Sequence, residues 1–182
     1  MKTDANLMNK EKQALIIRKY LQYLKLEKSL SINTQEAYKQ DLDKLLHYLK
    51  SEQTGVLEVS MQQLQTFFAG LHDIGIVPRS QARILSGVKS FFHFMVLADY
   101  RDDDPSELIE GPKIGLRLPE VLTVEEIDRI IAAVDCDKPE AQRNRAMLET
   151  LYSCGLRVSE LCGLKVSELY VKQGFIKVEG KG

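Results

Sequence analysis

The sequence predicts a mainly α-helical protein in two parts. A bundle of four helices is expected over residues 1–110, and the helical start of a second domain, with an incomplete β-hairpin at its end, over residues 121–182. Apolar residues recur at steps of three and four through most of the chain, which is the period of an amphipathic helix. Ser, Thr or Asn followed three residues later by Glu or Gln marks several helix starts. Gly and Pro gather between residues 111 and 120, which indicates a linker.

Composition is that of an ordinary globular protein. The 182 residues are 44% hydrophobic and 28% charged, and 25 Lys and Arg against 26 Asp and Glu give a formal net charge of -1, which excludes disordered, collagen-like and coiled-coil classes. No stretch approaches the roughly 18 apolar residues of a membrane span, and no signal peptide is visible, so we expect a cytoplasmic protein with no membrane partner. The three cysteines form no CxxC pair and have no histidine at zinc-ligand spacing. We therefore expect no metal site and reduced, mostly buried thiols.

Helix-start signals define the first part. The four expected helices cover residues 11–27, 33–50, 60–71 and 80–97. Asn33 with Glu36, and Ser60 with Gln63, have the spacing of capping boxes. An acidic run before Pro105 predicts one further helical turn that ends at Leu108.

The second part also contains helix start and stop signals. Thr123 with Glu126 predicts a helix start, Pro139 begins the next helix, and Gly155 ends it. A short helix is expected over 158–164, and residues 174–180 alternate like a strand that enters a hairpin turn at 180–182. Because a lone strand cannot satisfy its backbone groups, we expect the chain to be cut in the middle of a sheet.

The fourth helix has two distinct faces. Its apolar residues fall on one side, and residues 74–98 contain no Asp or Glu. The other side carries Arg79, Arg83, Ser86, Ser90 and His93, with Lys89 beside it. Such a cationic, hydroxyl-bearing face can lie against DNA phosphates or in a major groove. The alternative is a face that is only solvated.

Three further places could meet a phosphate. Ser31, Asn33 and Thr34 offer hydroxyls, an amide and unpaired N–H groups at a helix start, although plain capping explains them as well. Arg157, after Gly155, could clamp a phosphoryl oxygen from a partly desolvated pocket, or be a surface arginine. Lys181, between two glycines at an expected turn, could donate a proton, or be only solvated.

Several short sequence motifs, in their order along the chain, resemble those of the tyrosine recombinases of the integrase superfamily, and among them the XerC/XerD type. These motifs are SINTQEAYKQDL at 31–42, ARILSGVKSFF at 82–92, DDPS at 103–106, LPEVLT at 118–123, RAML at 145–148, LYSCGLRVSEL at 151–161 and GKG at 180–182. The resemblance runs along nearly the whole chain.

The resemblance implies a SAM-like core-binding domain that, with a catalytic domain, clamps duplex DNA. In such enzymes a tyrosine attacks the scissile phosphodiester to give a 3′-phosphotyrosine, without a metal or cofactor. It implies that Arg157 binds the scissile phosphate, that Lys181 protonates the leaving 5′-oxygen and that Glu160 supports the arginine. It also favours DNA contacts by Ser31, Asn33, Thr34, Arg79, Arg83, Ser86, Lys89 and Ser90.

The expected partners follow from the same resemblance. They are double-stranded DNA with a two-half-site recombination site, a related recombinase in a tetramer, and a DNA translocase as a further candidate. The later family motif with a histidine, the second arginine and the nucleophilic tyrosine has no counterpart here, so we expect a recombinase fragment that binds DNA without cutting it. The alternatives are a phage or mobile-element integrase, a naturally truncated DNA-binding module, and a helical protein-interaction domain.

Overall fold

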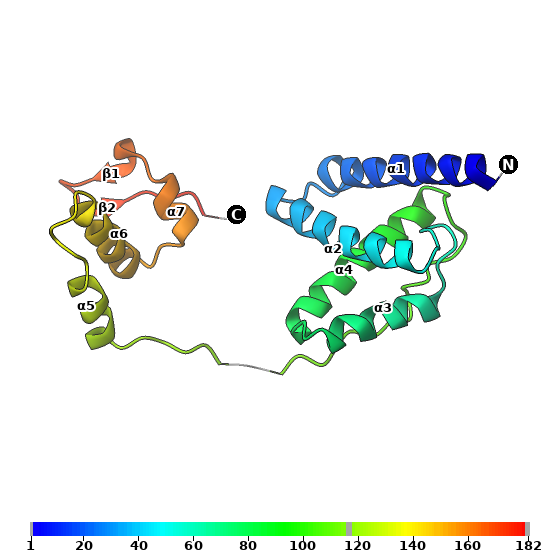
Figure 1. The fold of residues 1–182 in the computed structure, drawn as a ribbon. Helices are drawn as coiled ribbons and strands as arrows, with labels where there is room; N and C mark the ends of the chain where they lie inside the picture. Colours follow the sequence, from blue (N-terminus) through cyan, green and yellow to red (C-terminus); the bar gives the residue numbers. More distant parts are fainter. Residues whose placement is uncertain (1, 116–117, 181–182) are drawn as a thin grey trace. The chain divides into compact units, whose positions relative to one another are not determined.

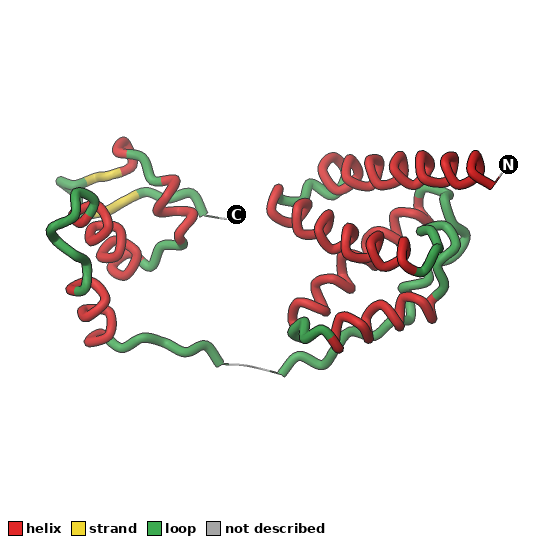
Figure 2. The backbone as a smooth tube through the Cα atoms, viewed as in Figure 1, coloured by secondary structure: helices red, strands yellow, loops and turns green. Residues whose placement is uncertain are grey.

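The computed structural model describes residues 2–115 and 118–180, which fall into two compact units, residues 1–116 and 117–182 (Figure 1). The described part of the first unit is helical: α1 (Lys2–Leu26), α2 (Ile32–Ser51), α3 (Met61–Asp73) and α4 (Pro78–Leu97). The second contains α5 (Val124–Ala132), α6 (Ala141–Cys154), α7 (Val158–Gly163), a 3₁₀ turn (Val166–Glu168) and the strands β1 (Leu169–Tyr170) and β2 (Phe175–Ile176). The predicted mainly helical fold is confirmed (Figure 2).

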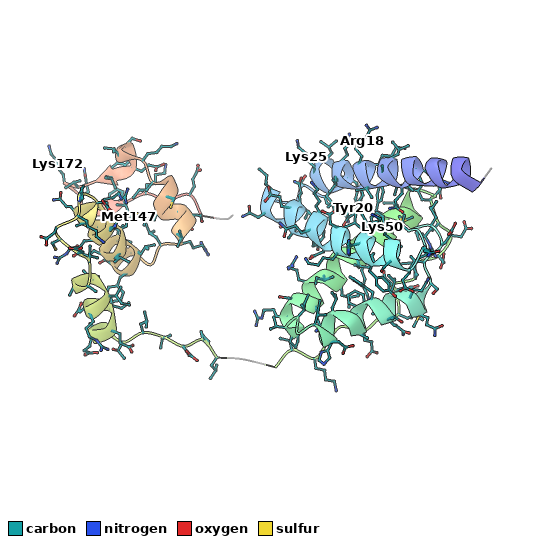
Figure 3. The ribbon with its side chains drawn as sticks, viewed as in Figure 1. Arg18, Tyr20, Lys25, Lys50, Met147 and Lys172 are labelled. Atoms are coloured by element: carbon teal, nitrogen blue, oxygen red, sulfur yellow. The ribbon has the colours of Figure 1, made fainter. Side chains whose placement is uncertain are left out.

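The core of the first unit lies around α4, which packs against the other three helices. Tyr20 extends from α1 into this core (Figure 3), where its ring meets that of Phe91 edge to face with centroids 5.1 Å apart. The large side chains that are almost fully buried include Ile16, Tyr20, Leu24, Leu42, Leu45, Leu49, Leu64, Ile84, Phe91, Phe92 and Met95. These are the apolar stripes of the helices, so amphipathicity positions all four.

Three helices of the first unit begin earlier than predicted. Helix α1 begins at Lys2 and not at residue 11, and α4 begins at Pro78, because proline fits the first turn of a helix. The N-cap of α2 is Ser31, whose hydroxyl accepts the Thr34 N–H, and Asn33 is already inside the helix. The Gln35 side-chain amide donates to Leu30 O at 2.7 Å and fixes the preceding loop against the helix. The N-cap of α2 therefore lies two residues before the predicted Asn33. The capping box of Ser60 is confirmed.

The segment after α4 contains the expected turn. Residues 105–108 form one hydrogen-bonded turn, and Asp104 Oδ1 accepts the Ser106 N–H at 2.8 Å. The turn therefore ends at Leu108 as the acidic start before Pro105 predicts.

The second unit confirms some expected boundaries and corrects others. Thr123 caps α5 through a capping box, and Gly155 ends α6 in the left-handed region with φ +61°. Helix α6 begins at Ala141, because Pro139 lies in the preceding turn. The expected lone strand is wrong: Phe175–Ile176 pairs antiparallel with Leu169–Tyr170 upstream. The turn expected at 180–182 falls largely outside the described residues.

Burial differs sharply between the units. In the described part of the second unit, Ala141 is the one buried residue, and Val124 and Ile130 of the expected α5 stripe are exposed. All three cysteines are exposed as well, so the prediction of mostly buried thiols is wrong. Helix α5 packs on α6 and α6 on α7, and such pairwise contacts leave no interior in which a side chain could be enclosed. None of the described helices is long and apolar enough to cross a membrane.

Candidate DNA interface and phosphate-binding residues

The two faces predicted for α4 are present. Ile84, Val88 and Phe91 are buried, and the polar residues lie toward solvent. Arg79, Arg83, Ser86 and His93 are exposed, and Lys89 and Ser90 are partly buried. Helix α4 therefore displays its cationic and hydroxyl side chains on one face of the bundle.

Arg83 is nevertheless engaged with an acid. Its Nη1 donates to Oδ2 of Asp41 on α2 and, at 3.5 Å, to the carbonyl oxygen of Ala37. The Asp41 side chain is completely buried, whereas that of Arg83 is 43% exposed. Lys44 Nζ meets the other carboxylate oxygen of Asp41 at 3.3 Å. The expectation of a stripe free of acids is thus correct for α4 itself, but α2 supplies a carboxylate to it.

The other candidates on α4 have weaker ties. Lys89 Nζ donates to Glu107 O at 3.0 Å, and the Ser86 hydroxyl donates to Ala82 O at 3.0 Å. Ser90 lies beside Tyr20, whose pKa is raised chiefly by burial and is partly held back by a hydrogen bond with the Ser90 hydroxyl. Among the described residues Lys89 makes only this side-chain hydrogen bond to Glu107 O, so two of its three N–H donors are available to an outside acceptor.

The start of α2 is built by capping. Ser31 Oγ accepts the Thr34 N–H at 3.4 Å and lies 2.9 Å from Thr34 Oγ1. Ser31 and Asn33 are exposed and Thr34 is partly buried. The capping interpretation is thus realised, and the N–H groups of Ile32 and Asn33, which precede the first intrahelical hydrogen bonds, still point out of the helix.

In the second unit, Arg157 is the N-cap residue of α7. Glu160 Oε2 accepts the Arg157 backbone N–H at 2.7 Å, and Glu160 Oε1 accepts from Nη1 at 2.6 Å. The first of these bonds, and then the second, lowers the pKa of Glu160. The Arg157 side chain is 67% exposed, which agrees with the alternative of a surface arginine and not with a partly desolvated pocket. Ala141 is the one buried residue in the described part of this unit, so a largely exposed Arg157 is typical of its surroundings.

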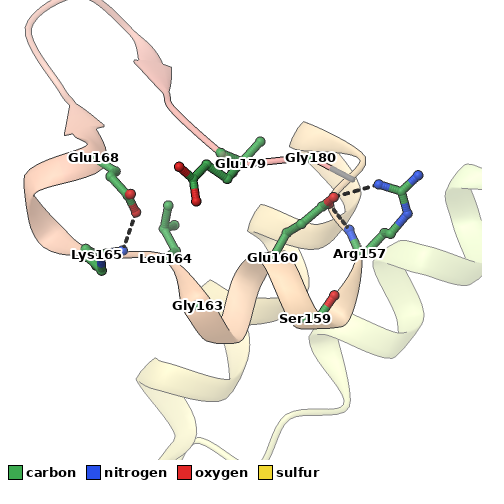
Figure 4. Close-up of a pocket in the computed structure, with 10 residues that line it drawn as sticks. Arg157, Ser159, Glu160, Gly163, Leu164, Lys165, Glu168, Glu179 and Gly180 are labelled. Carbon is green, nitrogen blue, oxygen red and sulfur yellow. Dashed lines mark hydrogen bonds and ion pairs between the residues drawn. The ribbon is translucent and has the colours of Figure 1, made fainter. Parts of the chain in front are cut away.

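A shallow pocket of about 270 Å³ adjoins Arg157 (Figure 4). It is lined by α7 and the residues that follow it on one side, and by Val178, Glu179 and Gly180 on the other. The chain segment that leads directly to Lys181 therefore lies beside Arg157, while Lys181 itself lies outside the described residues. Among the described residues, no three His, Cys, Asp or Glu form a group that could hold a metal ion.

Asp41 and Lys44 were missed by sequence reasoning. Asp41 stands four residues after Ala37 and four before Leu45, on the apolar face of α2. An acid at such a position needs a partner, because burying an unpaired charge is costly. That signal could have predicted a cation opposite it.

Two family models match successive parts of the chain. "Phage integrase, N-terminal SAM-like domain" matches residues 17–99, and "Phage integrase family" matches residues 120–182. The first covers the described four-helix bundle from the middle of α1 to the end of α4, and the second begins just before α5. Arg157 falls in the second.

Curated relatives are similar over nearly the whole chain. The tyrosine recombinase XerD of Proteus mirabilis is 40% identical over 174 residues, which are 96% of this chain and 56% of that protein. XerD of Pasteurella multocida is 36% identical, with 94% and 58% covered. XerD of Staphylococcus haemolyticus is 38% identical, with 92% and 57% covered. The chain thus spans little more than half the length of these relatives.

Solved structures share the fold. A lambda integrase tetramer bound to a Holliday junction superposes with a TM-score of 0.74 at 19% identity, covering 91% of this chain and 45% of that chain. A lambda integrase dimer bound to a COC′ core site gives 0.70 at 20% identity, with 90% and 45% covered.

Proposed function

Since this chain belongs to the phage integrase family, the tyrosine recombinases, we propose that it is the DNA-binding and early catalytic part of a site-specific recombinase. The whole protein cuts and rejoins duplex DNA through a 3′-phosphotyrosine. Residues 1–182 bind the duplex, and the nucleophilic tyrosine belongs to sequence beyond them.

The observation that carries DNA binding is the exposed face of α4. Arg79, Arg83 and Ser86 share this face, no Asp or Glu occurs on the helix, and α2 packs beside it. Fixed cations on one helix face neutralise phosphates and release counterions, which supplies most of the affinity for duplex DNA. Ser31, Asn33, Thr34, Lys89 and Ser90 complete the proposed interface.

We assign the early catalytic roles to Arg157 and Lys181. Arg157 binds the scissile phosphate, because the planar guanidinium can neutralise the charge that develops on a pentacoordinate phosphoryl group. Within the described residues the Arg157 side chain donates through Nη1 to Glu160, so its Nε and Nη2 N–H groups are available for that task. Lys181 protonates the leaving 5′-oxygen, and the pocket that joins Arg157 to residues 178–180 supports this pairing.

The whole protein acts, in this proposal, with a related recombinase in a tetramer on a site of two half-sites. The similarity to XerD recombinases favours chromosome dimer resolution, and hence chromosome partition at cell division, in the cytoplasm. The alternative is a phage or mobile-element integrase. The fold shared with lambda integrase does not by itself favour this alternative over chromosome dimer resolution. A DNA translocase partner stays a prediction, with no support from the comparisons.

The test is duplex binding with a charge-matched control. The chain is titrated with a fluorescent mixed-sequence duplex at several salt concentrations, as Arg79→Gln and as Arg18→Gln, which removes an arginine that points outward from α1 (Figure 3). Arg79→Gln weakens binding about tenfold and lowers the salt slope by about 1, whereas Arg18→Gln changes neither. Equal behaviour of the two variants would contradict the proposed interface. Arg79 is preferred to Arg83 here because a change at Arg83 also disturbs Asp41.

A further inference from the structure

We propose that Asp41 is a positioning residue for the DNA interface: it holds Arg83 by Nη1 so that the Nε and Nη2 N–H groups form an outward fork for one phosphate. The inference rests on the proposed function, since it assigns how one residue of that interface is aimed.

The burial of Asp41 is the first step. A carboxylate with no exposed surface is stable only when cations and hydrogen bonds compensate it. Arg83 and Lys44 supply that compensation from opposite sides, one on each carboxylate oxygen. If Arg83 moved away, Oδ2 of this buried carboxylate would lose its cation and only Lys44 on Oδ1 would remain, so the position of Arg83 is constrained.

The packing around Asp41 makes it a rigid anchor. A Cβ built on Gly87 of α4 would lie 3.4 Å from both Cβ and Oδ2 of Asp41 and 3.5 Å from the Tyr38 ring. The carboxylate therefore lies against the α4 backbone, one helical turn after Arg83. The Tyr20 hydroxyl donates to Gly87 O at 3.4 Å and fixes the same stretch from α1.

The hydrogen-bond pattern of Arg83 gives the fork. Among the described residues, all its hydrogen bonds run through Nη1, to Asp41 and to Ala37 O. The Nε–Nη2 edge of a guanidinium can bind two phosphate oxygens side by side. With its side chain 43% exposed, Arg83 is anchored at one nitrogen and open at this edge.

The sign of the charge effect separates positioning from simple electrostatics. Asp41→Asn removes a negative charge, so electrostatics alone makes duplex binding tighter. If Asp41 aims Arg83, the same change makes binding weaker. Asp43→Asn is the matched control, since it removes an exposed acid from the same helix.

The experiment is a double-mutant cycle on the whole chain, read by duplex affinity at several salt concentrations. Asp41→Asn is expected to weaken binding about tenfold, Asp43→Asn not to weaken it, and Asp41→Asn to have no further effect in Arg83→Gln. Circular dichroism and thermal melting establish that each variant is folded. Arg83→Lys retains the cation opposite Asp41 but lacks the fork, and it is expected to weaken binding while it stays folded.

The possible results distinguish failure of the positioning role of Asp41 from failure of the proposed DNA-binding function. If Arg79→Gln weakens binding but Asp41→Asn binds as well as or better than the parent chain, the positioning role is wrong. If folded Arg83→Lys binds duplex DNA as tightly as the parent chain, Arg83 does not bind a phosphate through a fork. This test remains valid even if Asp41→Asn fails to fold. If the parent chain does not bind duplex DNA, the proposed function itself fails.

Discussion

One carboxylate, that of Glu160, accepts both the backbone N–H of Arg157 at 2.7 Å and its Nη1 at 2.6 Å. The residue that starts α7 is thus fixed at its main chain and at its side chain by the same partner. The Glu160 side chain is only 12% exposed, so the acidic half of this contact is shielded from solvent although Arg157 is not. The contact keeps Arg157 beside the pocket that reaches Gly180.

The pKa of Glu160 provides a direct check. Its two bonds to Arg157 lower that pKa below the usual glutamate range in the folded chain. The stabilisation is therefore present at pH above the unfolded pKa and is lost as pH falls through the folded one. In a ¹³C carboxyl titration, Glu160 titrates below glutamate in an unfolded peptide, and Arg157→Ala raises its midpoint part of the way, since the backbone bond remains. A midpoint unchanged by Arg157→Ala would contradict the side-chain contact.

Gly155 sets the path of the chain into Arg157. At φ +61° it ends α6, and an L-residue there is strained by about 1 kcal/mol. Gly155→Ala should thus lower the thermal stability of the helical signal, by circular dichroism. Gly163→Ala is the control: Gly163 ends α7, its φ is not in the left-handed region and no heavy atom lies within 4 Å of an added Cβ. A stability loss at Gly163 equal to that at Gly155 would refute the argument.

Phe91 is one of the largest side chains buried in the described core of the bundle. It is fully buried and contacts the rings of Tyr20 and Phe92. Phe91→Ala is expected to lower the free energy of unfolding by about 3 to 5 kcal/mol. Tyr20→Phe, which keeps the ring and removes the hydroxyl with its hydrogen bonds to Gly87 O and Ser90, costs about 1 kcal/mol. Urea unfolding measures the free energy of unfolding of both variants. Similar decreases for the two would show that the buried Phe91 ring contributes little to stability.

The capping box of α3 should contribute measurably. Ser60 Oγ accepts the Gln63 N–H at 3.3 Å, and Gln63 Oε1 accepts the Ser60 N–H at 2.9 Å. Ser60→Ala therefore destabilises the first unit by about 1 kcal/mol in urea unfolding. Ser86→Ala, on the exposed middle of α4, should cost nothing, because alanine favours a helix interior. If both variants lowered the free energy of unfolding equally, loss of the capping hydrogen bond would not explain the effect of Ser60→Ala.

Local patterns predicted what local physics determines. Apolar steps of three and four located α2, α3 and α4, and the boxes at Ser60 and Thr123 marked true helix starts. The start of α2 was misplaced because Asn33 also has capping spacing, and the loop contact of Gln35 with Leu30 decides for Ser31.

Nonlocal contacts were out of reach. Asp41 and Arg83 are 42 positions apart, so no window of the sequence joins them. β1 is two residues long, too short for an alternating pattern, and its turn depends on Gly174 at φ +74°. The exposed cysteines were missed because composition predicts burial for a complete core, whereas the described second unit buries almost nothing.

An NMR titration that maps where duplex DNA contacts the chain tests the proposed interface on α2 and α4. Uniformly ¹⁵N-labelled protein is titrated with a mixed-sequence duplex, and the amide shift changes are assigned along the sequence. We expect the changes in the first unit to concentrate at residues 31–41 and 79–93, where α2 and α4 carry the proposed interface. Changes concentrated on α3, with α2 and α4 unaffected, would contradict it.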